Sequence, residues 1–166
     1  MWVVFKYKNH QYEFLKKNFK KEINNDVKFY NPKVKYSKNI KNKYHSKEKY
    51  ILENYAFCYL EKFSNTGYLN KFKNIKGLSY FLTGCIHQQE EISKFVNLCI
   101  DHEKEDGTLS SSFFSNFEST KAKFLSGPFA DVVFQIIERQ KNKLKILLGN
   151  IETIVEKKSN ILYLPL

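Results

Sequence analysis

The sequence has little arginine and no long apolar run, and both shortages restrict what it can be. Arg139 is the only arginine among 28 basic residues, and this lysine-rich usage is typical of an AT-rich genome. No run of about 18 apolar residues occurs, so no segment is expected to cross a membrane. The stretch Met1–Lys6 lacks a basic leading region and a small-residue cleavage site, and it is not expected to be a signal peptide.

Cysteine is also scarce. Cys58, Cys85 and Cys99 are odd in number and lack paired spacing, which favours reduced thiols in a cytoplasmic protein. Cys85 and His87 are the closest Cys/His pair in the sequence, and we do not expect them to form a zinc site. No glycine-rich loop with a lysine is available to cradle a phosphate group. We therefore expect no metal, no cofactor and no enzymatic activity.

Positive charge is abundant and unevenly distributed. The formal net charge is +11, and residues 1–50 hold 14 lysines against four acidic residues. A basic first half joined to a nearly neutral second half suggests that the first half contacts a polyanion. The alternative is a set of solvated lysines without a ligand.

Hydrophobic periodicity predicts an α+β fold for the first hundred residues. Helices are predicted from the spacing of Tyr12, Leu15, Phe19 and Ile23, and over Thr66–Lys73 and Gln88–Glu103. Strands are predicted over Trp2–Phe5, Val27–Tyr30, Ile51–Leu60 and Leu78–Leu82. The basic segment 33–50 is interpreted as an exposed hairpin, with disorder around 40–46 as the alternative. Together these elements predict an antiparallel sheet with helices packed on it.

The strand predicted over Ile51–Leu60 has large aromatic side chains on one face. Strand alternation places Tyr55, Phe57 and Tyr59 on that face and Ala56 on the other. Aromatic side chains that point outward usually mark a contact surface, whereas core packing is the alternative for each.

A boundary rich in serine and turn formers follows, over residues 106–120. Phe113, Phe114 and Phe117 are unusual in a free linker and are predicted to dock on a neighbouring domain.

The stretch Phe124–Asn150 is predicted to form a turn between two apolar strands. Gly127 and Pro128 supply the break, and apolar runs follow over 132–137 and 144–148. Residues 120–166 would then form a small five-stranded barrel. A helical spacing is also present at Leu144, Leu147, Leu148, Ile151, Ile154 and Val155. Periodicity leaves strand and helix open, although Gly149 opposes a long helix by about 1 kcal/mol.

Four pieces of the chain resemble the NusG/RfaH family of transcription factors. They are the opening Trp2-Val3-Val4, the strand Asn54-Tyr55-Ala56-Phe57, the strand Ile75–Leu82, and the turn Gly127-Pro128-Phe129-Ala130-Asp131. The resemblance implies an N-terminal NGN domain over 1–106, a linker over 107–119 and a KOW-type domain over 120–166. Glu53 stands where the family usually has proline. The glycine that follows the KOW turn is absent, and Val132 and Val133 stand there instead.

The resemblance also implies a function, a transcription elongation or antitermination factor that binds the clamp helices of RNA polymerase. The polymerase-binding candidates carried over are Leu52, Tyr55, Phe57 and Phe81. The gate-side candidates are Ser64, Asn65 and Thr66. Non-template DNA would meet Lys8, His10 and Lys76 through phosphate contacts, and the KOW turn comprises Gly127, Pro128 and Phe129.

The missing glycine favours a specialised RfaH-like paralogue, in which the C-terminal domain can also rest as a helical hairpin on the clamp-binding face. One alternative is the general NusG factor, which couples to Rho or a ribosomal protein through its C-terminal domain. Another is a KOW-bearing RNA- or ribosome-binding protein without a polymerase role. In each case a monomer without membrane association is expected.

Overall fold

The computed structural model describes residues 1–23, 27–40, 43–110, 113–114, 120–127, 129–156 and 162–166. At 37–40 and 43–44 the description covers the backbone alone. The chain forms two compact units, and each contains two pieces of the sequence. The first unit comprises Met1–Pro32 and Leu52–Asp101, and the second comprises Lys33–Ile51 and His102–Leu166. The boundaries expected from the sequence, after residues 106 and 119, stay predictions.

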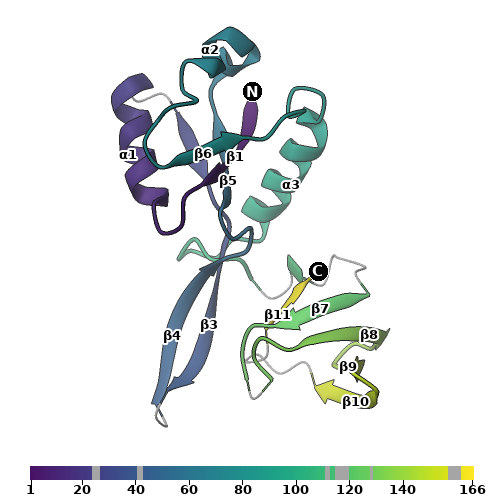
Figure 1. Ribbon diagram of the computed structural model, residues 1–166. Coiled ribbons are helices and arrows are strands. Elements are labelled where there is room, and N and C mark those ends of the chain that lie inside the picture. Colours follow the sequence, from purple (N-terminus) through teal and green to yellow (C-terminus); the bar gives the residue numbers. More distant parts are fainter. Residues whose placement is uncertain (24–26, 41–42, 111–112, 115–119, 128, 157–161) are drawn as a thin grey trace. The chain divides into compact units, whose positions relative to one another are not determined.

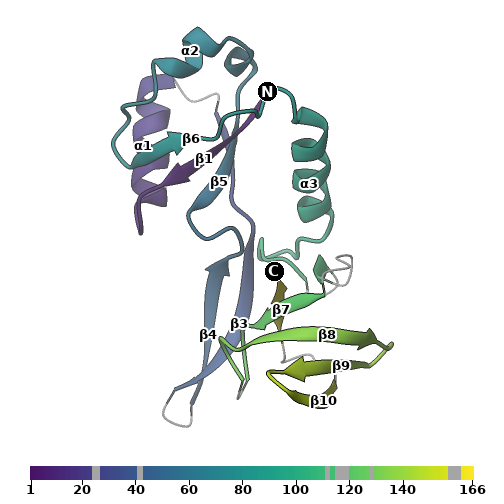
Figure 2. The ribbon, with the colours of Figure 1, turned by 45° about the vertical axis from the view of Figure 1, so that its right-hand side comes forward.

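The first unit is an antiparallel sheet between helices. Its elements are β1 Trp2–Tyr7, α1 Tyr12–Ile23, β2 Lys28–Tyr30, β5 Tyr55–Tyr59, the 3-10 helix η1 Glu61–Ser64, α2 Thr66–Asn70, β6 Leu78–Phe81 and α3 Gln89–Asp101. The strands lie in the order β2-β5-β1-β6. Figures 1 and 2 show α1 on one side of this sheet and α3 on the other. The predicted α+β class is therefore confirmed.

Two predicted elements have a bound that differs by three residues or more from the one expected from the sequence. The helix expected to reach Lys73 ends at Asn70. The strand expected from Ile51 begins at Tyr55, because residues 51–54 form a turn in which the Tyr55 amide donates to the Leu52 carbonyl at 2.9 Å.

Helix α1 buries the face that its periodicity predicts, which consists of Tyr12, Leu15, Phe19 and Ile23. Phe19 is completely buried, and its ring centroid lies 5.6 Å from that of Phe29 and 6.2 Å from that of Phe5. Phe72 and Phe81 also lie within about 6 Å of it. The core of the first unit is thus an aromatic cluster centred on one helix residue.

Gly77 lets the chain pass close to α1 before β6 begins. Its φ of 97° lies in the left-handed region, and an ideal Cβ would approach the Leu15 Cβ to 3.2 Å. A larger residue would therefore meet both backbone strain and a steric clash. Its neighbour Lys76 is held by a hydrogen bond in which the Asn18 amide donates to the Lys76 carbonyl at 3.1 Å.

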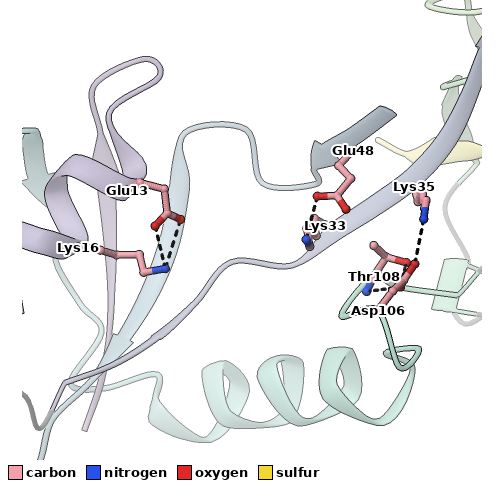
Figure 3. Close-up of polar contacts among 7 residues, drawn as sticks. All are labelled: Glu13, Lys16, Lys33, Lys35, Glu48, Asp106 and Thr108. Carbon is pink, nitrogen blue, oxygen red and sulfur yellow. Dashed lines mark hydrogen bonds and ion pairs between the residues drawn. The ribbon is translucent and has the colours of Figure 1, made fainter. Parts of the chain in front are cut away.

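In the second unit, β3 Lys33–Ile40 and β4 Lys43–Tyr50 pair in register over eight positions and form a two-stranded sheet. The Lys33 ammonium contacts the Glu48 carboxylate at 2.8 Å, and Lys35 contacts Asp106 at 3.4 Å (Figure 3). The hydrogen bond to Glu48 raises the pKa of Lys33. The hairpin interpretation is confirmed, while residues 41–42 of the expected disordered tip lie outside the described residues.

The segment after α3 is held by local polar contacts. Asp106 accepts hydrogen bonds from the Thr108 amide at 3.0 Å and from the Thr108 hydroxyl at 2.6 Å. The bond from the hydroxyl is the main cause that lowers the pKa of Asp106. The same residues appear beside Lys35 in Figure 3. Phe113 and Phe114 are buried, with ring centroids 5.1 Å apart. These two aromatic residues pack as part of the second unit, and Phe117 lies outside the described residues.

The rest of the second unit is a five-stranded antiparallel sheet. Its strands are β7 Lys121–Phe124, β8 Val133–Arg139, β9 Lys143–Leu148, β10 Ile151–Glu156 and β11 Tyr163–Pro165, in the order β10-β9-β8-β7-β11. Phe124 and Phe134 stack in its core with ring centroids 4.1 Å apart. The strand interpretation of 132–148 is confirmed. Closure into a barrel and a second, helical state stay predictions.

The two outer strands of this sheet differ in character. In β10, Ile151 is 70% exposed and Ile154 is 61% exposed, and Glu152 and Glu156 lie beside them. Glu152 also contacts the Lys145 ammonium at 2.9 Å. The other outer strand, β11, ends at a proline.

Candidate functional site

The central strand β1 separates the two faces of the first sheet. Val3, Phe5 and Tyr7 are buried, and Phe5 and Tyr7 contact aromatic residues of α1. By strand alternation Trp2, Val4 and Lys6 therefore occupy the opposite face. The Gln89 side chain of α3 accepts from the Trp2 amide at 2.9 Å and donates to the Trp2 carbonyl at 2.8 Å. Helix α3 thus covers the Trp2 end of this face.

At the other end of β1, a lysine and two tyrosines form a cluster that we call the Lys6 cluster. The register pairs Lys6 with Tyr55 of β5 and with Tyr80 of β6. The Lys6 ammonium lies 5.3 Å from the ring centroid of Tyr55 and 5.8 Å from that of Tyr80. The two tyrosine hydroxyls are hydrogen-bonded at 2.9 Å, and Tyr80 is 46% exposed. The cluster therefore presents aromatic rings and one cation at the surface.

The two tyrosines of the Lys6 cluster titrate differently because they share a hydrogen bond. The bond from Tyr80 stabilises the ionised form of Tyr55 and lowers the pKa of Tyr55, with a further contribution from the charge of Lys6. The same bond raises the pKa of Tyr80. Because a tyrosine is either neutral or negative, Lys6 supplies the positive charge of the cluster.

Two predicted polymerase-contact residues lie inside the unit. Phe57 shares the face of Tyr55, as expected, but it is only 5% exposed because α3 covers it, with the ring of Phe95 at 5.8 Å. This corrects the expectation that Phe57 points outward. Phe81 is half-buried on the other face, 6.0 Å from Phe19. Their role in polymerase binding stays a prediction, and only Tyr55 among these three lies in the Lys6 cluster.

The fourth candidate, Leu52, is half-buried in the turn that leads into β5. The next residue, Glu53, has a φ of 53°, which is unusual for a residue with a side chain. The Tyr7 hydroxyl donates to the Glu53 carbonyl at 2.6 Å and holds this conformation. This strained turn places Leu52 next to Tyr55, at the end of the sheet face that carries the Lys6 cluster.

Replacing Glu53 with glycine is expected to raise the free energy of unfolding by up to about 1 kcal/mol, because glycine adopts a positive φ without the cost that a side chain incurs. Glu22→Gly is a charge-matched control. Glu22 lies on the exposed face of α1, one residue before its last, where glycine should cost at most about 1 kcal/mol and bring no gain from a positive φ. Urea unfolding followed by Trp2 fluorescence measures both changes. A Glu53→Gly variant as destabilised as Glu22→Gly would contradict the strain argument.

The three gate-side candidates are exposed and have local structural roles. Asn65 caps α2 by accepting from the Tyr68 amide at 3.2 Å. The Ser64 hydroxyl donates to the Glu61 carbonyl at 3.0 Å. Thr66 is the first residue of α2. The structure therefore brings them together in one exposed turn, and a contact with the polymerase stays a prediction.

The nucleic-acid candidates lie in two loops that meet beside α1, with Lys8 and His10 in the loop before α1 and Lys76 in the loop before β6. Lys8 and His10 are exposed, and the Lys8 amide donates to the Gly77 carbonyl at 2.9 Å, next to Lys76. His10 has a φ of 61°, a strained conformation of the kind that often occurs at functional positions. Lys76 lines a cavity of about 360 Å³. The residues lining it are Asn18, Lys21, Glu22, Lys71, Phe72, Asn74, Ile75 and Lys76.

That cavity combines lysines with an apolar surface. Lys21, Lys71 and Lys76 supply cations, while Phe72 and Ile75 supply apolar contacts. The lysines suit a phosphate group, but Glu22 also lines the cavity, and Phe72 is only 7% exposed and offers no open ring face on which a base could stack. Sequence reasoning found Lys76 but missed Lys21 and Lys71, because their proximity depends on the packing of the 71–76 loop against α1.

Gly127 and Phe129 of the predicted KOW turn lie in the loop that joins β7 to β8. Gly127 has a φ of 86°, and the Ala130 amide donates to the Gly127 carbonyl at 3.2 Å. Phe129 is 48% exposed, with its ring 6.1 Å from that of Phe124. Pro128 lies outside the described residues.

Other chemistry is limited in the described part of the chain. No three His, Cys, Asp or Glu side chains among the described residues gather in a way that could hold a metal ion. The three cysteines are buried and form no disulfide with one another, and burial raises the pKa of Cys58. Of the helices in the described ranges, none has both the length and the apolar character of a membrane span.

Comparison with known proteins gives weak similarities only. The structure described as "Crystal Structure of MjSpt4:Spt5 complex conformation B" has 14% identity and a TM-score of 0.35, over 99% of this chain and 97% of that chain. The structure described as "Domain interaction in Thermotoga maritima NusG" has 16% identity and a TM-score of 0.36, over 96% and 94% of the two chains. No protein-family model and no curated protein matches the sequence. Identities and TM-scores this low establish neither the family nor the function of the chain.

Proposed function

We propose that this protein is a transcription elongation and antitermination factor that binds RNA polymerase through the face of the first sheet that carries the Lys6 cluster. The observation that carries the proposal is the exposed group of Lys6, Tyr55 and Tyr80. Tyrosines are enriched in protein interfaces because their rings bury a large area at a low entropic cost. The resemblance of Asn54-Tyr55-Ala56-Phe57 to the NusG/RfaH family supports the clamp helices as the proposed partner.

A nucleic-acid contact would accompany polymerase binding. Lys8, His10 and Lys76 would meet the non-template DNA strand, and the cavity beside Lys76 would accept a phosphate group of its backbone. Lysine contacts of this kind provide affinity for phosphate without reading the sequence. The gate-side turn at Ser64, Asn65 and Thr66 would contact the opposite side of the polymerase cleft.

The second unit would bind a further partner, and the identity of that partner differs between members of the family. Val133 and Ile137 of β8 are about half exposed, as expected for a surface that meets Rho or a ribosomal protein. Val132 and Val133, in place of the family's glycine, favour a specialised RfaH-like factor over the general NusG factor. The protein would act as a cytoplasmic monomer.

Removing both tyrosine side chains of the Lys6 cluster is expected to weaken polymerase binding at least about 30-fold, the loss that corresponds to one interface hot spot. The measurement is a titration of full-length Tyr55→Ala/Tyr80→Ala protein against RNA polymerase. Phe14→Ala is the control, because Phe14 is 49% exposed on α1, on the other side of the sheet. Tyr55→Phe/Tyr80→Phe keeps both rings and should retain most of the affinity.

Wild-type affinity of the Tyr55→Ala/Tyr80→Ala variant would contradict the proposed surface. If the wild-type chain bound RNA but not the polymerase, the five-stranded sheet would instead favour the KOW-type RNA- or ribosome-binding function. Titrating the 1–106 fragment beside the full chain against RNA polymerase distinguishes a general NusG-like factor from an RfaH-like factor. Equal affinity would indicate a general factor, and binding by the fragment alone would indicate a masked clamp surface.

A further inference from the structure

The β3–β4 hairpin is a two-stranded ribbon that the proposed polymerase contacts leave unused. Its strands pair from Lys33 opposite Tyr50 to Ile40 opposite Lys43, and the sheet they form contains these two strands alone among the described residues. Eight positions at roughly 3.3 Å each give the ribbon a length of about 26 Å. It therefore presents a long, narrow surface.

The ribbon is strongly basic in sequence. Residues 33–50 contain seven lysines, and Glu48 is their only acidic residue. The stretch 33–47 contains no acidic residue at all. A segment with this composition attracts polyanions wherever its lysines are accessible.

The charges are distributed unequally between the two faces of the ribbon. In an antiparallel pair, opposite residues share a face, so Lys33, Lys35 and Glu48 lie on one face. The lysines of this face are compensated, because Lys33 contacts Glu48 at 2.8 Å and Lys35 contacts Asp106 at 3.4 Å. This face has little charge left to offer a ligand.

The other face carries lysines without carboxylate partners. Lys49 lies opposite Val34, and Lys47 lies opposite Tyr36. Lys47 is exposed and Lys49 is partly exposed, and neither forms an ion pair among the described residues. The unbalanced positive charge of the ribbon therefore lies on the face of Lys47 and Lys49.

We propose that this ribbon binds duplex DNA, with Lys47 and Lys49 contacting the phosphate backbone. A two-stranded β-ribbon fits the major groove of B-DNA, which is about 12 Å wide. Lysines act there as point charges on phosphate groups, so the binding is independent of sequence. Single strands are a poorer match, because they need exposed aromatic rings on which bases stack, and Tyr36 and Tyr50 are half-buried.

The proposal is tested without RNA polymerase, so its outcome is independent of the proposed function. Full-length protein is titrated against a fluorescein-labelled 30-base-pair duplex at several salt concentrations, with anisotropy as the readout. Lys47→Gln/Lys49→Gln is compared with Lys141→Gln/Lys143→Gln, which removes two exposed lysines, one in the turn between β8 and β9 and one at the start of β9, and changes the net charge equally. Lys47→Arg/Lys49→Arg keeps both charges.

Loss of two phosphate contacts is expected to reduce the slope of log K against log[salt] by about 1.8 and the affinity at least about tenfold. The control pair and the arginine variant should bind like the wild type. Equal weakening by both glutamine pairs would show that net charge alone matters and would overturn the proposal. An unchanged Lys47→Gln/Lys49→Gln variant, or tighter binding of the corresponding single strand than of the duplex, would also overturn it.

Discussion

Replacing Phe19 with alanine is expected to lower the free energy of unfolding of the first unit by about 3–5 kcal/mol. Phe19 is completely buried. Its ring packs beside those of Phe29 in β2, Phe72 in the loop after α2 and Phe81 in β6. Removing the ring opens a cavity that these rigid neighbours are poorly able to fill. Loss of this size is a large part of the stability of a typical domain.

Trp2 makes this prediction easy to measure, because it is the only tryptophan and lies in the first unit. Urea unfolding followed by its fluorescence therefore reports on that unit. Phe14→Ala, on the exposed side of the same helix, should change the unfolding free energy by less than about 0.5 kcal/mol. A Phe19→Ala variant within about 1 kcal/mol of wild type would show that the aromatic cluster is not the main source of stability.

Phe134→Ala should have a comparable effect in the second unit, with a loss of about 3–5 kcal/mol. Phe134 stacks on Phe124 at 4.1 Å and meets Tyr163 edge to face at 6.0 Å. These three residues connect β8 with β7 and β11, so their contact holds the sheet order together. A small sheet has few other apolar contacts to compensate for this loss.

Amide hydrogen exchange resolved by segment measures this effect, because it reports local opening along the chain. We expect exchange in Phe134→Ala to accelerate across β7, β8 and β9 and to stay slow in β1 and α1. Val133→Ala is the matched control, since the neighbouring side chain is 50% exposed and its loss should leave exchange nearly unchanged. Equal acceleration in both units would contradict the division of the chain into separate cores.

The helical face of α1 could be predicted from the sequence because the information is local. Leu15, Phe19 and Ile23 recur at the helical period, and all three are buried. The β3–β4 hairpin could also be predicted from the sequence, because weak alternation of apolar residues with lysines indicates an exposed strand. For β8 and β9, the spacing fitted both strand and helix. Pairing with the neighbouring strands β7 and β10 decides the outcome, and periodicity within a single segment carries no information about that pairing.

The candidate site depended more on distant contacts, and the sequence was a poorer guide to it. Alternation correctly placed Phe57 beside Tyr55 on one face. It carried no information that Phe95, almost 40 residues later in the chain, covers Phe57. Tyr80 and Lys6 were missed for the same reason, because only the β5-β1-β6 order brings them next to Tyr55. Alternation in β6 could have assigned Tyr80 to the face opposite Phe81.

The outer strands of the five-stranded sheet have a consequence for self-association. Among the described residues, no strand pairs with the outer side of β10, and such an edge with exposed isoleucines is a template on which a second chain could add and begin an aggregate. Glu152 and Glu156 oppose this, because stacking copies would bring like charges together. At the opposite edge, Pro165 lacks an amide hydrogen to donate to an incoming strand. Charge and proline thus act as gatekeepers of a sheet whose surface would otherwise favour strand-by-strand growth.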